Sequence, residues 1–390
     1  MSEPVVRVAA RGDGVTASGR HVPLAAPGDL LLADGTLEPG PMRQVPPCRH
    51  FPECGGCQLQ HLNDDAYRQY LVDRVRLALV QHGLEPTVRK PHLSPPRTRR
   101  RASLRAARAG KTVVLGFNAE RSHKIIDMRE CHVLRPELFA LVQPLRRLLG
   151  ALLPARGSAE VRMTLCDQGA DLAIAGVAVE GLAATELLTD FAERQRLARL
   201  SVDEGYGPET RYEPAPATVT LSGTPVPLPL GAFLQATEDG EAALVEAVRE
   251  VTTGAERTVD LFAGIGTFAL AAGGQVHAAE ASRDAVLALK SAKPGITAEH
   301  RDLYRRPLTG EELTRFDAAV LDPPRAGAAE QVAQLAASAV PRVAYVSCNP
   351  ATFARDARAL VDGGYRLDRI LPVGQFTWST HVELAAAFSR

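Results

Sequence analysis

The sequence has few cysteines, no net charge and no long hydrophobic run, and each of these absences excludes a class of protein. Six cysteines in 390 residues are too few and too unevenly spread for a secreted disulfide scaffold. No apolar run approaches the ~18 residues of a membrane-spanning helix. The first residues also lack the basic and apolar regions of a signal peptide. The sequence therefore predicts a cytoplasmic protein.

The length and the net charge of the chain limit the number of domains and the kind of nucleic-acid contact. A chain of 390 residues, 45% of them apolar, can bury a sizeable core and is expected to form two or three domains. Its 45 basic residues balance its 45 acidic residues. Any contact with nucleic acid must therefore come from a local basic patch.

The residues from Val343 to Pro350 are the first candidate for chemistry. Their mostly apolar run predicts a buried strand of a parallel sheet, and a helix is expected over 351–361 after Pro350. Cys348 would then lie at the carboxyl end of a strand, where open α/β sheets bind ligands. It would also lie at a helix N-terminus, which lowers the pKa of a thiol. By spacing alone, a nucleophile and a small buried core residue fit equally well.

Residues 1–44 contain short runs of β-forming residues separated by turn signals such as Gly12-Asp13-Gly14 and Asp34-Gly35. This pattern predicts a small all-β unit. A compact β-barrel that binds RNA and a purely structural appendage are both consistent with the composition.

Cys48, Cys54 and Cys57 lie close together in the sequence, and Cys131 follows far downstream. Four thiolates suit a structural zinc ion or a [4Fe-4S] cluster. Zinc sites usually pair two short Cys-x-x-Cys segments, whereas here three ligands cluster and the fourth is remote. The spacing therefore favours the iron–sulfur cluster. Cys166 lies in an alternating stretch and is expected in the core.

Six arginines follow this region without an acidic residue among them. They are Arg97, Arg99, Arg100, Arg101, Arg105 and Arg108. A charge run is usually a solvated face, but arginine also binds phosphate groups in a bidentate manner. The run therefore favours contact with a nucleic acid.

The second half reads as alternating strands and helices, with a strand, a glycine-rich turn and a helix from residue 258 onward. Gly264 and Gly266 match a dinucleotide-binding pattern, but Asp260 at the strand tip would repel a pyrophosphate. The Asp260 carboxylate would instead attract S-adenosylmethionine, which carries a sulfonium and an ammonium group. Glu280, at the end of the next strand, can accept hydrogen bonds from ribose hydroxyls. Asp302 follows the third strand and is expected near the adenine.

The fourth strand, residues 318–321, ends at Asp322-Pro-Pro-Arg325. Enzymes that methylate exocyclic amino groups carry an aromatic residue at the end of the comparable motif. Arg325 does not replace it, so this class of methyltransferase is disfavoured.

A cysteine and a methyl donor together point to methylation of a pyrimidine carbon. Carbon-5 of uracil is a poor nucleophile until a thiolate adds to carbon-6. A base must afterwards remove the carbon-5 proton. Cys348 can supply the thiolate, and either Glu383 or His381, before the last apolar run, can supply the base.

These motifs resemble those of the bacterial RNA uracil-C5 methyltransferases, in particular the iron–sulfur branch that acts on 23S ribosomal RNA. The matching segments include the four cysteines, the arginine run, Asp260-Leu-Phe262-Ala-Gly264, Asp322-Pro-Pro-Arg325, Ser347-Cys348-Asn349-Pro350 and His381-Val-Glu383. Ala263 and Thr267 depart from residues common in the family. A similar reaction on tRNA and a non-catalytic RNA-binding iron–sulfur protein are the alternatives. Methylation of cytosine carbon-5 is disfavoured. Enzymes of that class resemble a pattern in which a second cysteine follows the Asp-Pro-Pro-like motif, and here Arg325 follows it.

The resemblance implies the fold, the cofactors and the site residues. It implies an α/β fold with a Rossmann-like class I methyltransferase domain over 230–390, a central α+β iron–sulfur domain over 45–229 and a small β-barrel over 1–44. It implies Cys348 as nucleophile and Glu383 as base. The implied S-adenosylmethionine contacts are Gln235, Phe262, Thr267, Glu280, Asp302 and Asp322, and the implied [4Fe-4S] ligands are Cys48, Cys54, Cys57 and Cys131. The expected partner is RNA, bound by a monomer.

Overall fold

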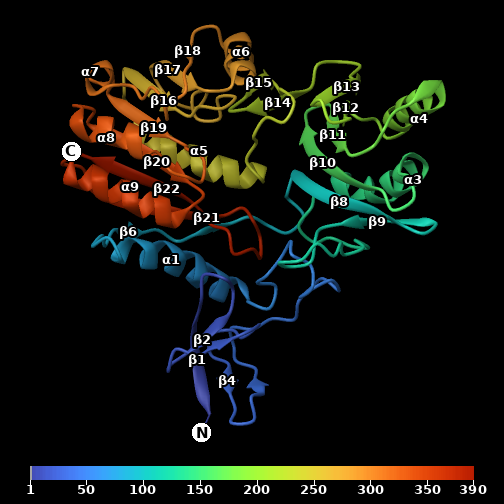
Figure 1. Ribbon diagram of the computed structural model, residues 1–390. Helices are drawn as coiled ribbons and strands as arrows, with labels where there is room; N and C mark the ends of the chain where they lie inside the picture. Colours follow the sequence, from blue (N-terminus) through green and yellow to red (C-terminus); the bar gives the residue numbers. More distant parts are fainter. Residues whose placement is uncertain (1) are drawn as a thin grey trace. The chain divides into compact units, whose positions relative to one another are not determined.

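The chain forms two compact units, each assembled from separate stretches of sequence (Figure 1). The computed structural model describes residues 2–390, so Met1, the first residue of the predicted segment 1–44, lies outside the described residues. The first unit contains the described residues up to Asn63, together with Pro95–Val219 and Thr377–Thr380. The second contains Asp64–Ser94, Thr220–Phe376 and His381–Arg390. Among residues 2–390, no helix is both long and apolar enough to cross a membrane.

A small antiparallel sheet begins the first unit. Its strands are β1 (Glu3–Val8), β2 (Gly14–Thr16), β3 (His21–Val22), β4 (Leu30–Leu31) and β5 (Leu37–Glu38), in the order β3-β2-β1-β4-β5. Val5, Val22, Ala25 and Leu31 form its core. The short strands predicted for this segment are therefore present.

The first unit also contains a six-stranded sheet, in the order β13-β12-β11-β10-β8-β9. Its strands are β8 (Arg101–Ala109), β9 (Thr112–Gly116), β10 (Ser158–Cys166), β11 (Gly169–Ala175), β12 (Arg199–Asp203) and β13 (Pro208–Tyr212). Its helices are α2 (Pro136–Ala140), α3 (Val142–Leu152) and α4 (Gly181–Arg194). Ala102, Leu104 and Ala106 alternate along β8 and face one core with leucines of these helices. Strand alternation of period two therefore decides which face is covered.

The second unit is built on a nine-stranded sheet, whose main path is β18-β17-β16-β19-β20-β22-β21-β6 and in which β7 also pairs with β21. The strands are β6 (Thr87–Val88), β7 (His92–Leu93), β16 (Arg257–Leu261), β17 (Gln275–Glu280), β18 (Thr297–His300), β19 (Ala318–Leu321), β20 (Arg342–Ser347), β21 (Arg366–Gly374) and β22 (Glu383–Ser389). β16 to β20 run parallel, and β22 is antiparallel to both β20 and β21. The predicted parallel α/β sheet is therefore confirmed.

Helices pack against this sheet and against one another. They are α1 (Asp64–Val80), α5 (Glu238–Thr252), α6 (Arg283–Ala292), α7 (Gly310–Leu313), α8 (Ala329–Ala337) and α9 (Pro350–Asp362). α5 packs on β19, β20 and β22, whereas α8 and α1 both contact α9. Figure 1 shows α8 and α9 lying side by side. β14 (Thr218–Leu221) and β15 (Thr224–Pro227) form a separate two-stranded sheet.

The helix predicted after the glycine-rich turn is wrong. Residues 264–271 form consecutive turns, held by hydrogen bonds such as Leu270 N–H to the Gly266 carbonyl. Gly264 and Gly266 both adopt positive φ angles, of 54° and 98°, which an α-helix does not contain. A Cβ at Gly266 would lie 2.5 Å from a Leu289 methyl group, so glycine there allows the turn to pack on α6.

Candidate active site

Cys348 lies where the sequence predicts it, directly after β20 and before α9. Asn349 caps α9, because its Oδ1 accepts the Ala351 N–H at 3.2 Å, and Pro350 occupies the first helical turn. Ser347 Oγ accepts the Asn349 N–H at 3.2 Å. The thiol is half-buried. The cap and the proline therefore fix the turn that presents Cys348.

Glu383 is the nearest carboxylate by strand register. β20 and β22 pair Ser347 with Leu384 in antiparallel fashion, so the next positions along the two strands are Cys348 and Glu383. The Glu383 side chain is buried, with 3% of its surface exposed. His381, the other candidate base, is exposed, and its ring lies 5.7 Å from that of Phe376. The geometry therefore favours Glu383 over His381.

The pKa of the Cys348 thiol is raised, whereas the sequence predicted a lowered pKa. Burial raises its pKa to about 11, and the charges of Glu383 and Asp322 raise it further in the same direction, while Arg325 opposes them. The expectation of a pKa lowered by the helix N-terminus is wrong, because burial and two carboxylates outweigh the helix dipole. The thiol is protonated at neutral pH unless the surrounding negative charge is compensated.

The Asp322–Arg325 loop is held against the start of α9. The Arg325 carbonyl accepts hydrogen bonds from Asn349 Nδ2 at 3.0 Å and from Thr352 Oγ1 at 3.2 Å. Burial raises the pKa of Asp322 to about 7. Asn349, which caps α9, therefore also helps to position the loop that carries Asp322 and Arg325.

Asp260 is a buried carboxyl group in an unusual environment. It is completely buried at the tip of β16, and neither carboxyl oxygen has a hydrogen-bond partner of normal geometry among residues 2–390. Burial raises its pKa well above the usual range, and the negative charges of Asp322 and Glu280 add to the effect. The backbone of Ala269 opposes this shift only in part, and a charged carboxyl group buried here is costly, so this strand tip favours a cationic ligand.

Glu280 connects the glycine-rich turn to the next strand. Its Oε2 accepts the Gly264 N–H at 2.9 Å and its Oε1 accepts the Ser282 N–H at 2.6 Å. Asp302 Oδ1 accepts the Tyr304 N–H at 3.0 Å. Phe262 adopts a left-handed φ of 65°, and its ring lies 5.4 Å from that of Tyr304. These residues follow β16, β17 and β18 at one edge of the sheet.

Gln235 and Thr267 complete the predicted donor contacts. Gln235 Oε1 accepts a hydrogen bond from Gln375 Nε2 at 2.7 Å, and Gln375 Oε1 accepts the Ala236 N–H at 2.9 Å. Gln375 follows β21, whose carboxyl end lies at the same edge as that of β20. Thr267 is half-buried within the glycine-rich turn. The structure thus brings the strand-end members of the predicted set to one edge of the sheet.

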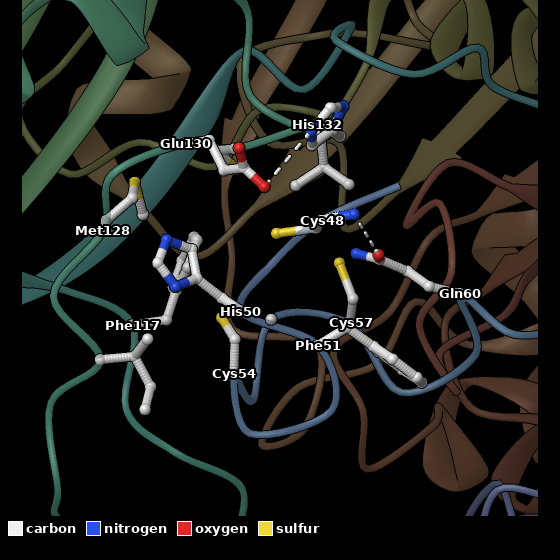
Figure 2. A pocket seen from close by; sticks show the side chains of 14 residues that line it. Cys48, His50, Phe51, Cys54, Cys57, Gln60, Phe117, Met128, Glu130 and His132 are labelled. Atoms are coloured by element: carbon white, nitrogen blue, oxygen red, sulfur yellow. Dashed lines mark hydrogen bonds and ion pairs between the residues drawn. The ribbon is translucent and has the colours of Figure 1, made fainter. Parts of the chain in front are cut away.

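The four predicted cluster ligands, Cys48, Cys54, Cys57 and Cys131, line one cavity in the first unit and are called the cysteine cage below. Figure 2 shows the sulfur atoms of Cys48, Cys54 and Cys57 around a common space. Burial raises the pKa of Cys57 to about 12, and the other three thiols add to the shift. Within the part of the chain that the structure describes, no three His, Cys, Asp or Glu side chains are grouped to hold a single metal ion. Cys166 is buried elsewhere, and its Sγ donates to the Gly169 carbonyl at 3.1 Å.

The arginine run does not form one exposed group. Arg100 is buried, with 5% of its surface exposed, and Arg99 Nε donates to the Arg101 carbonyl at 3.0 Å. Arg105 pairs with Glu160 at 3.0 Å, so the expectation of arginines without counter-ions is wrong for this residue. Arg97 remains exposed. Sequence alone misses these pairings, because Glu160 comes from a neighbouring strand.

Known proteins resemble this chain over its whole length. An uncharacterized RNA methyltransferase of Zymomonas mobilis is 49% identical over 99% of both chains. The 23S rRNA (uracil(1939)-C(5))-methyltransferase RlmD of Halomonas elongata is 35% identical over 87% of this chain and 76% of its own length. Residues 297–390 match the family described as tRNA (Uracil-5-)-methyltransferase. The chain belongs to the RNA uracil-C5 methyltransferase family. The recognition made from the sequence, and the assignment to an enzyme family, are confirmed.

The fold of this family member also matches a solved structure. The Pyrococcus abyssi tRNA (uracil-54, C5)-methyltransferase, crystallised with S-adenosyl-L-homocysteine, superposes with a TM-score of 0.74 over 100% of both chains at 24% identity. The predicted class I methyltransferase fold is therefore confirmed.

Two residues of this uracil-C5 methyltransferase family member escaped the sequence analysis. Gln375 contacts Gln235, and its place directly after an apolar strand could have indicated it. Tyr304 faces Phe262, and its Oη donates to the Gly327 carbonyl at 2.9 Å. Its position two residues after Asp302 is a weak signal, because an aromatic residue in a loop has many possible roles.

The ionisation of Cys348 gives a first prediction. Replacing Glu383 by Gln removes a negative charge next to the thiol, so the pKa of Cys348 falls from about 11. Alkylation of the Cys348 peptide by iodoacetamide, followed by mass spectrometry across pH 7–11, should show its midpoint at lower pH and a several-fold faster reaction at pH 8. Glu330→Gln, which removes an exposed charge on α8, is the control and should leave the midpoint unchanged. An identical pH profile in both variants would contradict the contact between Glu383 and Cys348.

Proposed function

We propose that this protein transfers a methyl group from S-adenosylmethionine to carbon-5 of uracil in RNA. The observation that carries the proposal is the position of Cys348 and Glu383, one residue beyond the Ser347–Leu384 strand pair, at the sheet edge where Asp260, Glu280 and Asp322 also lie. A thiol next to a buried carboxylate supplies the nucleophile and the base that the reaction requires. Membership of the RNA uracil-C5 methyltransferase family supports the same chemistry.

The residues present fit a cationic methyl donor. The buried carboxyl group of Asp260 and the buried Asp322 both have raised pKa values, so a positively charged ligand is favourable at this edge of the sheet. When bound, S-adenosylmethionine supplies an electrophilic methyl group on a sulfonium. The residues that would hold it are Gln235, Phe262, Thr267, Glu280, Asp302 and Asp322. The related archaeal enzyme was solved with S-adenosyl-L-homocysteine, which supports this assignment.

Cys348 and Glu383 would act in sequence. The Cys348 thiolate adds to carbon-6, and the ring becomes an enolate whose carbon-5 takes the methyl group as the bond from the donor sulfur to that methyl breaks. Glu383 then removes the proton from carbon-5, the carbon-5 to carbon-6 double bond re-forms, and the bond to Cys348 breaks to release the thiolate. The target uracil must leave any helical stack of the RNA to reach Cys348 and Glu383.

The cysteine cage would hold a [4Fe-4S] cluster. Four thiols around one cavity fit a cluster in which each iron takes one thiolate. Burial is the largest cause that raises the pKa of each of the four thiols, and bound iron would favour the thiolate forms that act as ligands.

The proposed RNA is 23S ribosomal RNA, and tRNA is the second candidate. The Halomonas relative named for 23S rRNA is more similar in sequence than the archaeal tRNA enzyme, at 35% against 24% identity. The small N-terminal sheet and exposed arginines such as Arg97 would contact the RNA backbone. We keep the division into segments 1–44, 45–229 and 230–390, a cytoplasmic location and a monomeric state as parts of this proposal.

Covalent trapping tests the nucleophile. RNA that carries 5-fluorouridine at the target should form an adduct with the protein, because fluorine at carbon-5 blocks the proton-removal step. Cys348→Ala should abolish the adduct and lower the methylation rate by at least about a thousandfold. The Cys166→Ala variant, which changes a buried cysteine outside the site, should still form the covalent adduct. On normal RNA, Glu383→Gln should slow turnover by about a hundredfold or more and accumulate the methylated covalent intermediate. An adduct that persists in Cys348→Ala would refute the assignment.

Iron content tests the cluster. Anaerobically purified protein should be brown and contain about four irons per chain. Cys131→Ser should lose most of this iron, because it removes one ligand, whereas Cys166→Ser should retain it. Stoichiometric zinc in place of iron would show that the cysteine cage holds another metal.

The identity of the RNA can be decided in cells. Mapping of 5-methyluridine across ribosomal RNA and tRNA from a strain that lacks this gene should show loss at a site in 23S rRNA. Loss confined to tRNA would transfer the proposal to the second candidate.

A further inference from the structure

The chain makes a short excursion between the last two strands of the catalytic sheet. After β21 ends at Gly374, residues Thr377–Thr380 belong to the first unit, and the chain returns to the second unit at His381. The excursion contains Trp378, the single tryptophan of the sequence. It ends three residues before Glu383, the proposed base.

Backbone hydrogen bonds tie this excursion to the loop of the cysteine cage. The Trp378 carbonyl accepts the N–H groups of Gln58 at 2.9 Å and Leu59 at 2.8 Å. The Thr380 N–H donates to Gln58 Oε1 at 3.4 Å, and Gln58 Nε2 donates to the Gly55 carbonyl at 2.7 Å. Gly55 lies between Cys54 and Cys57, and Gln58 and Leu59 directly follow Cys57. The excursion is therefore bonded to the same few residues that present two of the thiols.

The side chain of Trp378 packs on the cysteine cage itself. It forms one apolar cluster with Cys57 and Val133, against which Cys131 also packs, and only 7% of its surface is exposed. Its backbone has a left-handed φ of 59°, which is rare for a bulky residue. Such a conformation persists only where surrounding contacts impose it, and strained residues of this kind are concentrated at functional sites.

We propose that the cysteine cage, with its cluster bound, fixes Trp378 and thereby positions the chain that leads to Glu383. This inference rests on the proposed function and assigns a purpose to the cluster. Without iron, the loop from Cys54 to Leu59 loses the ligation that orders it, and the hydrogen bonds to the Trp378 carbonyl are no longer held in place. Glu383 then loses its alignment, whereas the donor contacts, all outside the excursion, are retained. Trp378 is a positioning residue that acts through Glu383.

Variants of Trp378 separate this role from a general effect on folding. Trp378→Ala, loaded with its normal iron content, should accumulate the methylated covalent intermediate on RNA as Glu383→Gln does. Its affinity for S-adenosylmethionine, measured by calorimetry, should remain within about twofold of wild type. Trp378→Phe keeps an aromatic ring against Cys57 and should restore turnover. Turnover at the wild-type rate in Trp378→Ala, or equal slowing of all steps without an intermediate, would overturn the proposal.

The tryptophan also reports on its own environment in the unmodified protein. Anaerobic removal of iron from the holoprotein with a chelator should shift the Trp378 emission to longer wavelength as the ring becomes exposed to water. Methylation should be lost in parallel, while donor binding persists. Lost methylation with an unchanged emission maximum would overturn this inference and leave the methyltransferase proposal intact. Protein that never contains iron and still methylates RNA would instead refute the cluster and, with it, this role of Trp378.

Discussion

The site depends on acidic side chains gathered at one edge of a parallel sheet. Parallel strands place their carboxyl ends together. Asp260, Glu280 and Asp322 are therefore brought to one edge although they are far apart in the sequence. Burial removes the water that would otherwise screen these groups. The raised pKa values of Asp260, Asp322 and Cys348 are consequences of the same constraint. A cation bound there would favour the ionised forms of these groups.

The sequence predicted those parts of the site that depend on local pattern. The strand 318–321 has the expected limits, Glu280 ends a strand as expected, and the turn at Cys348 has the expected strand before it and helix after it. Apolar runs that end in polar residues carry this information, because burial and strand ends are both local properties. Turns occupy the place of the helix predicted after Gly266, although the N–H groups of Leu270 and Ala272 still bond to carbonyls four residues earlier.

Other parts of the site depend on pairings that a single sequence does not encode locally. Glu383 becomes the neighbour of Cys348 only through the register of the antiparallel strand β22. Arg105 acquires its partner Glu160 from an adjacent strand, and Arg100 becomes buried, so a count of arginines overestimates the exposed charge. The sign of the pKa shift at Cys348 likewise requires the depth of burial and the two carboxylates. In each case the decisive quantity is the distance between residues far apart in the chain.

The interleaving of the two units has a consequence for how the protein is made. The first unit needs Thr377–Thr380, and the second needs Asp64–Ser94 as well as residues near the C-terminus. Neither can be completed from an N-terminal fragment, because contacts between distant parts of the chain form late. During synthesis, Cys57 is made long before Val133 and Trp378, the two residues with which it packs. Each unit is therefore completed only when residues from widely separated parts of the chain are present.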